Sequence, residues 1–266
     1  KKEANIVEIL RSGGYKTFWY DNQGKSENGA FAIDTYTPTS YRTMAKQSDV
    51  YSDEMSCAKD SSIIPILEEA LKDSTEQKII FLHLIGNHFD YRERYEKSLA
   101  QFDTNEGICS QFADELTPKE IETINAYDNG TLYNDYIIRT CIEMVRKQDG
   151  MSAMLYVSDH GEEVYDCLKN AGRSFGEGIT PTMCEPPLLL WINEEYKTVS
   201  NLYLNESIPT CTDDIIYGIM DLCRVKYHLY DSTKSLFHPS YLPKERFVQD
   251  FKYEDLIEKY PKSLCE

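Results

Sequence analysis

The stretch SAMLYVSDHGEE, residues 152–163, decides the fold class, because a short apolar run leads here directly into charged residues. The run at 152–158 has the length and composition of a buried strand. Asp159 and His160 follow at the point where that strand ends. Side chains beyond a strand no longer alternate between its two faces, so a carboxylate and an imidazole there can reach one divalent cation. The alternative is an Asp turn followed by a surface histidine and a solvated pair of glutamates.

Three more runs predict strands, and they lie on both sides of this stretch in the sequence. Residues 78–84 (KIIFLHL) and 187–192 (PLLLWI) are short and apolar, as strands buried on both faces are. Residues 15–20 (YKTFWY) follow a Gly-Gly pair and are rich in aromatic side chains. Strands of this kind, separated by helical patterns, predict an α/β fold with a mostly parallel central sheet and helices on both faces.

Helical patterns fill most of the intervals between these strands. The longest begins at residues 117–120 (TPKE), which have the spacing of a capping box with proline at the first helical position, and it extends to Met144. We expect Gly130 to kink or divide this helix. Shorter helices are expected at 6–10, after a Ser61 or Ser62 cap, and at 215–223 after a Thr212 or Asp213 cap.

The composition limits the function classes. The chain has 266 residues, with 28 Lys or Arg against 45 Asp or Glu, and a formal net charge of −17. Nucleic-acid-binding proteins concentrate positive charge to displace counterions from phosphates, so we expect no nucleic-acid partner. Hydrophobic residues make up 41% of the chain, which is enough for a sizeable core. Since no repeat or linker marks a boundary, we expect one domain over residues 1–266.

The sequence indicates neither a bilayer-spanning segment nor a small disulfide scaffold. No apolar run approaches the roughly 20 residues that cross a bilayer. The eight cysteines are spread over the chain, and none forms a CxxC pair of the kind found in zinc ribbons or redox motifs. Some could pair in an oxidising compartment, and the others are expected to be buried thiols.

The strand predicted at 78–84 also ends in residues that can carry chemistry. His83 belongs to the apolar run and is expected to be a hydrogen-bonded core residue. His88 lies beyond the strand, where α/β proteins bind ligands, and can ligate a metal or hydrogen-bond a phosphoryl oxygen. Arg92 and Arg94 add positive charge that suits an anionic group. Solvated ion pairing with a neighbouring glutamate is the alternative.

Taken together, these motifs resemble the phosphoethanolamine transferases of Gram-negative bacteria, which are membrane enzymes of the alkaline phosphatase and sulfatase superfamily. The resemblance implies an alkaline phosphatase-like α/β domain. The matching blocks occur in the family's order, and they are FLHLIGNHFDYRERY (81–95), YDNGTLYNDYII (127–138), LYVSDHGEE (155–163), PPLLLWIN (186–193) and TDDIIYGIMDL (212–222).

The resemblance implies Zn²⁺-dependent transfer of phosphoethanolamine from phosphatidylethanolamine, through a phosphorylated threonine, to lipid A or the lipopolysaccharide core. A metal lowers the cost of charge on a transferring phosphoryl group. By the same resemblance Asp159 and His160 are zinc ligands, and His88 is the loop histidine that contacts the phosphoryl group or a second metal. Glu162 follows the motif and is expected to orient the ligands.

The sequence departs from the family pattern in three places. The family's remaining zinc ligand, a glutamate, and its threonine nucleophile precede the region that residues 1–20 resemble, so neither has a matching position here. The Thr/Ser cluster at 35–40 falls in the wrong place to supply the nucleophile. A later family histidine is replaced by Glu177, which could coordinate metal or accept the ethanolamine ammonium, or be a solvated loop residue. The family's disulfide pattern is not reproduced.

These departures predict that the domain lacks its N-terminal strand and nucleophile segment, and that this chain alone binds zinc poorly and transfers little. Two alternatives remain: a sulfatase-like phosphodiesterase or hydrolase, and a non-catalytic relative that acts as a binding domain. His88, Arg92 and Glu177 are the expected substrate-binding residues. The expected location is the periplasmic face of the Gram-negative inner membrane, with attachment through a segment absent from this sequence.

Overall fold

The computed structural model describes residues 4–22, 59–173 and 178–260, together with the backbone of 40–43. The chain falls into two compact units, which are described separately below. The first unit comprises residues 1–85, 139–153 and 192–243, and the second comprises residues 86–138, 154–191 and 244–266.

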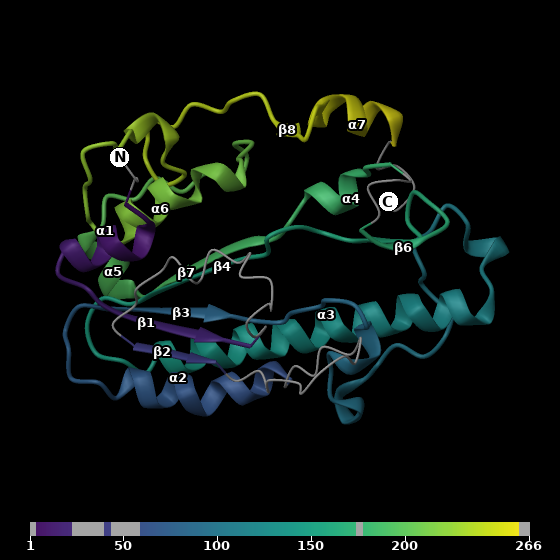
Figure 1. Ribbon diagram of the computed structural model, residues 1–266, viewed down its shortest axis with the longest axis horizontal. Coiled ribbons are helices and arrows are strands. Elements are labelled where there is room, and N and C mark those ends of the chain that lie inside the picture. Colours follow the sequence, from purple (N-terminus) through teal and green to yellow (C-terminus); the bar gives the residue numbers. More distant parts are fainter. Residues whose placement is uncertain (1–3, 23–39, 44–58, 174–177, 261–266) are drawn as a thin grey trace. The chain divides into compact units, whose positions relative to one another are not determined.

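The first unit is built on a parallel sheet of three strands in the order β2–β1–β3 (Figure 1). The strands are β1 (Lys16–Asp21), β2 (Ser40–Thr43) and β3 (Lys78–His83). β1 and β3 pair along their whole length, so that Asp21 lies beside His83. The carboxyl ends of these two strands therefore bring polar residues together, as parallel strands of α/β proteins do.

Helix α2 (Ile64–Leu71) packs on this sheet and is preceded by a short 3-10 turn, Asp60–Ile63. Neither segment has a side-chain cap, so the prediction of a serine cap was wrong. The buried Asp60 carboxylate instead accepts hydrogen bonds from Asn22 Nδ2 (2.6 Å) and the Ile85 N–H (3.0 Å). The core between helix and sheet consists of Phe18, Tyr20, Ile63 and Ala70, with Ile66, Ile80, Leu82 and Leu84 packed against it.

The remaining helices of the first unit are short. Asn5 caps α1 through a capping box, in which the Glu8 N–H donates to Asn5 Oδ1 and the Asn5 N–H donates to Glu8 Oε2, both at 3.0 Å. Asp214 is the N-cap residue of α6, in place of the expected Thr212 or Asp213. These elements are α1 (Ile6–Ser12), α5 (Glu194–Val199) and α6 (Ile215–Leu222), with 3-10 turns at Thr212–Asp214 and Ser232–Lys234.

Helix α3 (Pro118–Val145) is the longest element, with 28 residues, and contributes to both units. Its capping box is as predicted: the Thr117 N–H donates to Glu120 Oε2 (2.6 Å), and the Glu120 N–H donates to Thr117 Oγ1 (3.4 Å). The helix is continuous through Gly130, so the prediction that this glycine divides it was wrong. Gly130 has a different role, which is described with the site.

Strands β4 and β7 form a separate pair. Their bounds are Ala153–Val157 and Leu188–Ile192. At one end the Ser158 N–H donates to Pro187 O (3.3 Å), and at the other the Asn193 N–H donates to Ser152 O (3.0 Å). Between these two hydrogen bonds the residue number rises from 152 to 158 on the β4 side while it falls from 193 to 187 on the β7 side. The two strands therefore run antiparallel. The α/β class is confirmed, while this last strand departs from the parallel arrangement.

The second unit joins three distant segments of the chain in one core. Its buried side chains are Tyr91 from the loop after β3, Ile124 and Ala126 from α3, and Val164 from the segment after β4. The other elements are β5 (Glu163–Val164), β6 (Ala171–Gly172), α4 (Pro181–Cys184), β8 (Phe247–Val248), β9 (Phe251–Lys252) and α7 (Tyr253–Lys259), with 3-10 turns at Tyr91–Glu93, Lys97–Leu99 and Ala113–Glu115.

Two expectations about the whole chain bear on this fold. Within the described ranges, every helix is too short or too polar to cross a lipid bilayer. Cys109 is disulfide-bonded, as expected of some cysteines in this chain. Among the described residues, the free cysteines are Cys141, Cys167, Cys184, Cys211 and Cys223.

Candidate active site

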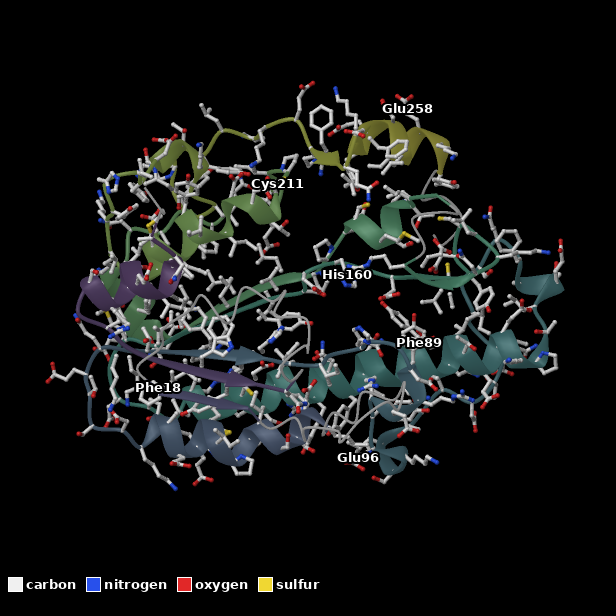
Figure 2. The ribbon with its side chains drawn as sticks, in the orientation of Figure 1. Phe18, Phe89, Glu96, His160, Cys211 and Glu258 are labelled. Atoms are coloured by element: carbon white, nitrogen blue, oxygen red, sulfur yellow. The ribbon has the colours of Figure 1, made fainter. Side chains whose placement is uncertain are left out.

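Asp159 and His160 lie in the loop that follows β4, where Figure 2 labels His160. His160 Nδ1 is 2.8 Å from the Gly161 carbonyl oxygen. A carbonyl oxygen only accepts, so Nδ1 carries the proton in this contact and the lone pair of the neutral ring is on Nε2. Nε2 lies 3.6 Å from Asp159 Oδ1. Two ligands of one tetrahedral zinc ion lie roughly 3.4 Å apart, so this donor pair fits two corners of a zinc site.

The side chains of Asp159 and His160 are also exposed enough for a metal ion or a phosphoryl group to reach them. The Asp159 side chain is 84% exposed and the His160 side chain 23% exposed. Within the part of the chain that the structure describes, no group of three or more His, Cys, Asp or Glu side chains could hold a metal ion. The assignment of Asp159 and His160 as zinc ligands stays a prediction, and two residues alone would not complete the four-ligand set of a zinc site.

Gly161 allows the loop after β4 to approach α4 closely. Its N–H donates to the Met183 carbonyl oxygen at 3.0 Å. A Cβ at residue 161 would overlap the Thr182 carbonyl oxygen, which is backbone and has little freedom to move. Only glycine fits here, and the close contact fixes the course of the chain immediately after His160.

Glu163 is buried rather than solvated. Its exposed fraction is 0%. Oε1 accepts from the N–H groups of Cys167 (2.8 Å) and Leu168 (3.1 Å), and Oε2 accepts from the Thr182 hydroxyl (3.1 Å). A buried carboxylate is tolerated when its oxygens accept several hydrogen bonds, as they do here. The alternative of a solvated pair of glutamates is therefore wrong, and Glu163 anchors the segment that follows the predicted metal ligands.

Tyr91 links the loop after β3 to the loop after β4. Its hydroxyl donates to Glu162 Oε2 at 3.2 Å, and Glu162 Oε1 lies 3.9 Å from His160 Nδ1. The tyrosine is 1% exposed, and its ring meets the Tyr127 ring edge-on, with centroids 5.1 Å apart. Burial and the adjacent Glu162 carboxylate raise the pKa of Tyr91 far above its usual value, so the hydroxyl keeps the proton that it donates.

Glu162 lies between Tyr91 and His160, and its expected role in orienting the ligands stays a prediction. Sequence reasoning had not singled out Tyr91. The available signal was its place three residues after His88, at the start of the run YRERY (91–95), in which every residue is aromatic or charged. A hydrogen bond between residues 71 positions apart cannot be derived from that spacing.

His88 is exposed in the loop after β3. Its Nδ1 lies 2.7 Å from the Phe89 carbonyl oxygen, which leaves the lone pair of the neutral ring on Nε2, as in His160. The preceding residue, Asn87, donates from Nδ2 to Tyr127 O (2.8 Å) and Thr131 Oγ1 (3.0 Å). The loop that carries His88 is thus attached to α3 on one side and, through Tyr91, to the loop of His160 on the other.

Arg92 and Arg94 differ in their surroundings. Arg92 is exposed, with Nη2 3.2 Å from Asp90 Oδ2 and Nη1 3.6 Å from Glu122 Oε1. The Asp90 carboxylate raises the pKa of the Arg92 guanidinium above its usual value. Arg94 is buried and donates from Nε to the Asp90 carbonyl oxygen at 3.2 Å. Two carboxylates therefore balance the charge of Arg92, and its expected role in binding substrate stays a prediction.

The other residues considered from sequence are accounted for as follows. His83, in the first unit, makes the predicted hydrogen bond, with Nδ1 3.0 Å from the buried Asp21 Oδ1. Glu177 lies outside the described residues, as do the candidate threonines Thr35, Thr37 and Thr39.

Comparisons with known proteins place this chain in a family. The family model described as Sulfatase matches residues 1–225. Phosphoethanolamine transferase EptC of Escherichia coli O18:K1:H7 is 29% identical over 263 residues, covering 96% of this chain and 44% of the relative. Kdo(2)-lipid A phosphoethanolamine 7''-transferase of Escherichia coli K12 is 26% identical over 199 residues, covering 73% of this chain and 33% of the relative.

A solved structure extends the likeness to the fold. The crystal structure of the C-terminal periplasmic domain of EptC from Escherichia coli in complex with zinc shares 26% identity, with a TM-score of 0.81, covering 99% of this chain and 75% of that one. The chain spans less than half the length of the curated relatives above. The resemblance to phosphoethanolamine transferases is confirmed by these matches. Since the family model covers most of its length, the chain belongs to the sulfatase family.

Proposed function

We propose that this chain contains catalytic residues of a transferase that moves phosphoethanolamine from phosphatidylethanolamine to a lipopolysaccharide or lipid A acceptor. Names of relatives support the transferred group and, in one case, a lipid A acceptor. The observation that carries the proposal is the hydrogen bond between Tyr91 and Glu162, because it joins the His88 loop to the Asp159–His160 loop. Two loops held together in this way can act on one substrate group.

Asp159 and His160 are proposed as zinc ligands. The supporting observations are the 3.6 Å separation of Asp159 Oδ1 and His160 Nε2 and the zinc complex of a related domain. Bound zinc would neutralise negative charge on a phosphoryl group. The Gly161 carbonyl oxygen accepts from His160 Nδ1 and orients the imidazole, while the Glu162 carboxylate lies 3.9 Å from the same nitrogen and would favour its protonated side. The nucleophile remains unassigned.

His88 and Arg92 are proposed to bind the donor. The exposed His88 presents the Nε2 side of its ring, which donates to a phosphoryl oxygen when that nitrogen is protonated. Arg92 would reach an anion only by giving up its contact with Asp90 or Glu122, so its contribution is expected to be smaller. Glu177 is proposed to accept the ethanolamine ammonium, on the grounds of charge.

The proposed location is the periplasmic face of the inner membrane of a Gram-negative bacterium. Solved relatives include a C-terminal periplasmic domain and an integral membrane lipooligosaccharide phosphoethanolamine transferase, the latter a likeness of fold. Phosphatidylethanolamine and the acceptor both belong to membranes, so a donor and an acceptor would be available to the same site there.

The test is a transfer assay with the full-length protein, phosphatidylethanolamine vesicles and purified lipopolysaccharide, followed by mass spectrometry of the lipids. We expect phosphoethanolamine on the acceptor, a loss of at least a hundredfold in rate for His160→Ala, and a smaller loss for His88→Gln. His228→Gln is the matched control, because His228 is exposed and belongs to the first unit. Release of free phosphoethanolamine instead would identify a hydrolase, and no turnover by zinc-loaded protein would favour the non-catalytic alternative.

A further inference from the structure

The second unit contains a cavity that includes none of the proposed metal ligands and shares only Arg92 with the proposed donor site. It has a volume of about 810 Å³, which is within the range of small-molecule sites. One face of α3 forms its floor, and residues 90–105 of the loop after β3 form its wall. The floor residues recur at helical spacing, and they are Pro118, Ile121, Glu122, Asn125, Ala126 and Asn129.

The wall of this cavity is fixed to its floor. Asn129 Oδ1 accepts from the N–H groups of Gln101 (2.7 Å) and Phe102 (3.1 Å), and Asn129 Nδ2 donates to Phe102 O (2.8 Å). At the other end Arg92 bridges Asp90 of the wall and Glu122 of the floor. Because both ends are held by side-chain contacts, the cavity is formed before a ligand enters, which lowers the entropic cost of binding.

Asn125 lies in the middle of the floor and has unused hydrogen-bonding capacity. The residue is only 8% exposed, and it lines the cavity. No described residue hydrogen-bonds to its side-chain amide, which can donate twice and accept twice. The Asn125 amide is open to the cavity and is free to bind a ligand that offers adjacent hydrogen-bond donors and acceptors.

The charges around the cavity select against an anion. Four carboxylates and two cations line it, and Arg92 is already engaged by two of the carboxylates. Among the described residues, Lys97, Glu93 and Asp103 take part in no ion pair. The net negative charge disfavours phosphate, while free carboxylates are strong acceptors for hydroxyl groups.

Two aromatic side chains complete the lining. Tyr95 and Phe102 both belong to the wall, and Phe102 is 44% exposed. An aromatic face offers apolar area at a small entropic cost, and a sugar ring offers apolar C–H groups on one face and hydroxyls at its edge. The cavity lining matches both parts of a sugar ring: the aromatic side chains suit its apolar C–H face, and the amide and carboxylates suit its hydroxyl groups.

We propose that this cavity is a saccharide-binding subsite, in which Asn125, Glu93 and Asp103 bind the hydroxyls of an uncharged sugar and Tyr95 and Phe102 pack against its ring. As the place where the glycan of the acceptor docks, the subsite rests on the proposed transferase function. The proposal that the cavity binds a sugar depends only on the residues that line the cavity.

The first test is binding of a neutral oligosaccharide of hexoses to the full-length protein, measured by isothermal titration. Asn125→Ala should weaken binding at least tenfold, because a site built around hydroxyls loses much when one partner is removed. The same substitution should leave the melting temperature unchanged or higher, since Asn125 lies within α3 and alanine is the better helix former. Asn201→Ala, at an exposed loop position, is the matched control.

Two outcomes would overturn the subsite: equal oligosaccharide affinity in wild type and Asn125→Ala, or Asn125-dependent binding of ethanolamine or inorganic phosphate in place of the sugar. In the transfer assay we expect Asn125→Ala to raise the acceptor KM more than it lowers kcat. If Asn125→Ala is active and its acceptor KM is unchanged, the proposed subsite is wrong, while the proposed transferase function is unaffected. If the wild-type protein transfers no phosphoethanolamine but binds sugar in a way that depends on Asn125, the proposed transferase function is wrong, while the sugar site is supported.

Discussion

The side chain of Asn87 occupies the space that the missing Cβ of Gly130 leaves on α3. A Cβ built at residue 130 would overlap Asn87 Oδ1. In that position Asn87 Nδ2 donates to the Tyr127 carbonyl oxygen and the Thr131 hydroxyl. The glycine therefore lets the loop that carries His88 rest directly on the helix.

Replacing this glycine should destabilise the protein even though alanine is the better helix former. Gly130→Ala gains up to about 1 kcal/mol of helix propensity, and it forces Asn87 out at a cost of about 2–3 kcal/mol. We expect a net loss of about 1–2 kcal/mol, measured by chemical denaturation.

The double substitution Asn87→Ala/Gly130→Ala is the control for that contact. Without the asparagine there is nothing to displace, so the double variant should be at least as stable as Asn87→Ala alone. Losses that simply add would show that the two residues do not interact as described.

Removing the Tyr91 hydroxyl should loosen the predicted zinc ligands. Tyr91→Phe leaves Glu162 Oε2 without its donor while the ring packing remains. The freed Glu162 carboxylate lies 3.9 Å from His160 Nδ1, so we expect a loss of up to about tenfold in metal affinity. The measurement is zinc affinity by competition with a chromophoric chelator.

Tyr127→Phe is the matched control for this measurement. Tyr127 belongs to the same aromatic cluster, and its hydroxyl forms no hydrogen bond with the described residues. Equal zinc affinities for Tyr91→Phe and Tyr127→Phe would contradict the role given to the Tyr91–Glu162 bond.

Asp166 should make stability depend on pH in a definite direction. Burial, together with the nearby Glu163 and Asp128, raises the pKa of Asp166 from 3.8 to about 6. The folded state then binds the proton more tightly than the unfolded state, so this stabilisation is full below about pH 4 and is lost as the pH rises through about 6.

Asp166→Asn tests that direction, because asparagine cannot ionise and can still accept from the Val164 N–H. The variant should be more stable than wild type above about pH 6, by about 1–2 kcal/mol after allowance for solvent screening. The gap should close below about pH 4 in thermal melts across this range. A gap that is constant with pH, or that opens on acidification, would contradict the assignment.

Much of the fold could be predicted because local patterns determine it. The apolar run at 78–84 became β3 at Lys78–His83, and the run at 152–158 became β4 at Ala153–Val157. The capping box at Thr117 marked the start of α3. In each case hydrophobic period and terminal chemistry are properties of neighbouring residues, which a sequence displays directly.

What the sequence could not reveal depends on residues far apart in the chain. β7 runs antiparallel to β4, and this direction depends on the path of the connecting chain between the two strands. The apolar composition of β7 would be the same if the strand ran in the other direction. Gly130 carries no local sign that Asn87 will lie against it, and helix propensity alone suggested a break. Glu163 looked solvated because its partners, Cys167, Leu168 and Thr182, are gathered only by the folded loop.

The most direct measurement is zinc binding to the full-length protein by isothermal titration, with metal content checked by mass spectrometry. We predict that wild type binds zinc and that Asp159→Asn and His160→Ala each weaken binding by a hundredfold or more, while His228→Gln leaves it unchanged. Zinc bound with the same affinity by wild type and His160→Ala would show that the loop after β4 is not the metal site, and the proposed transferase chemistry would lose its foundation.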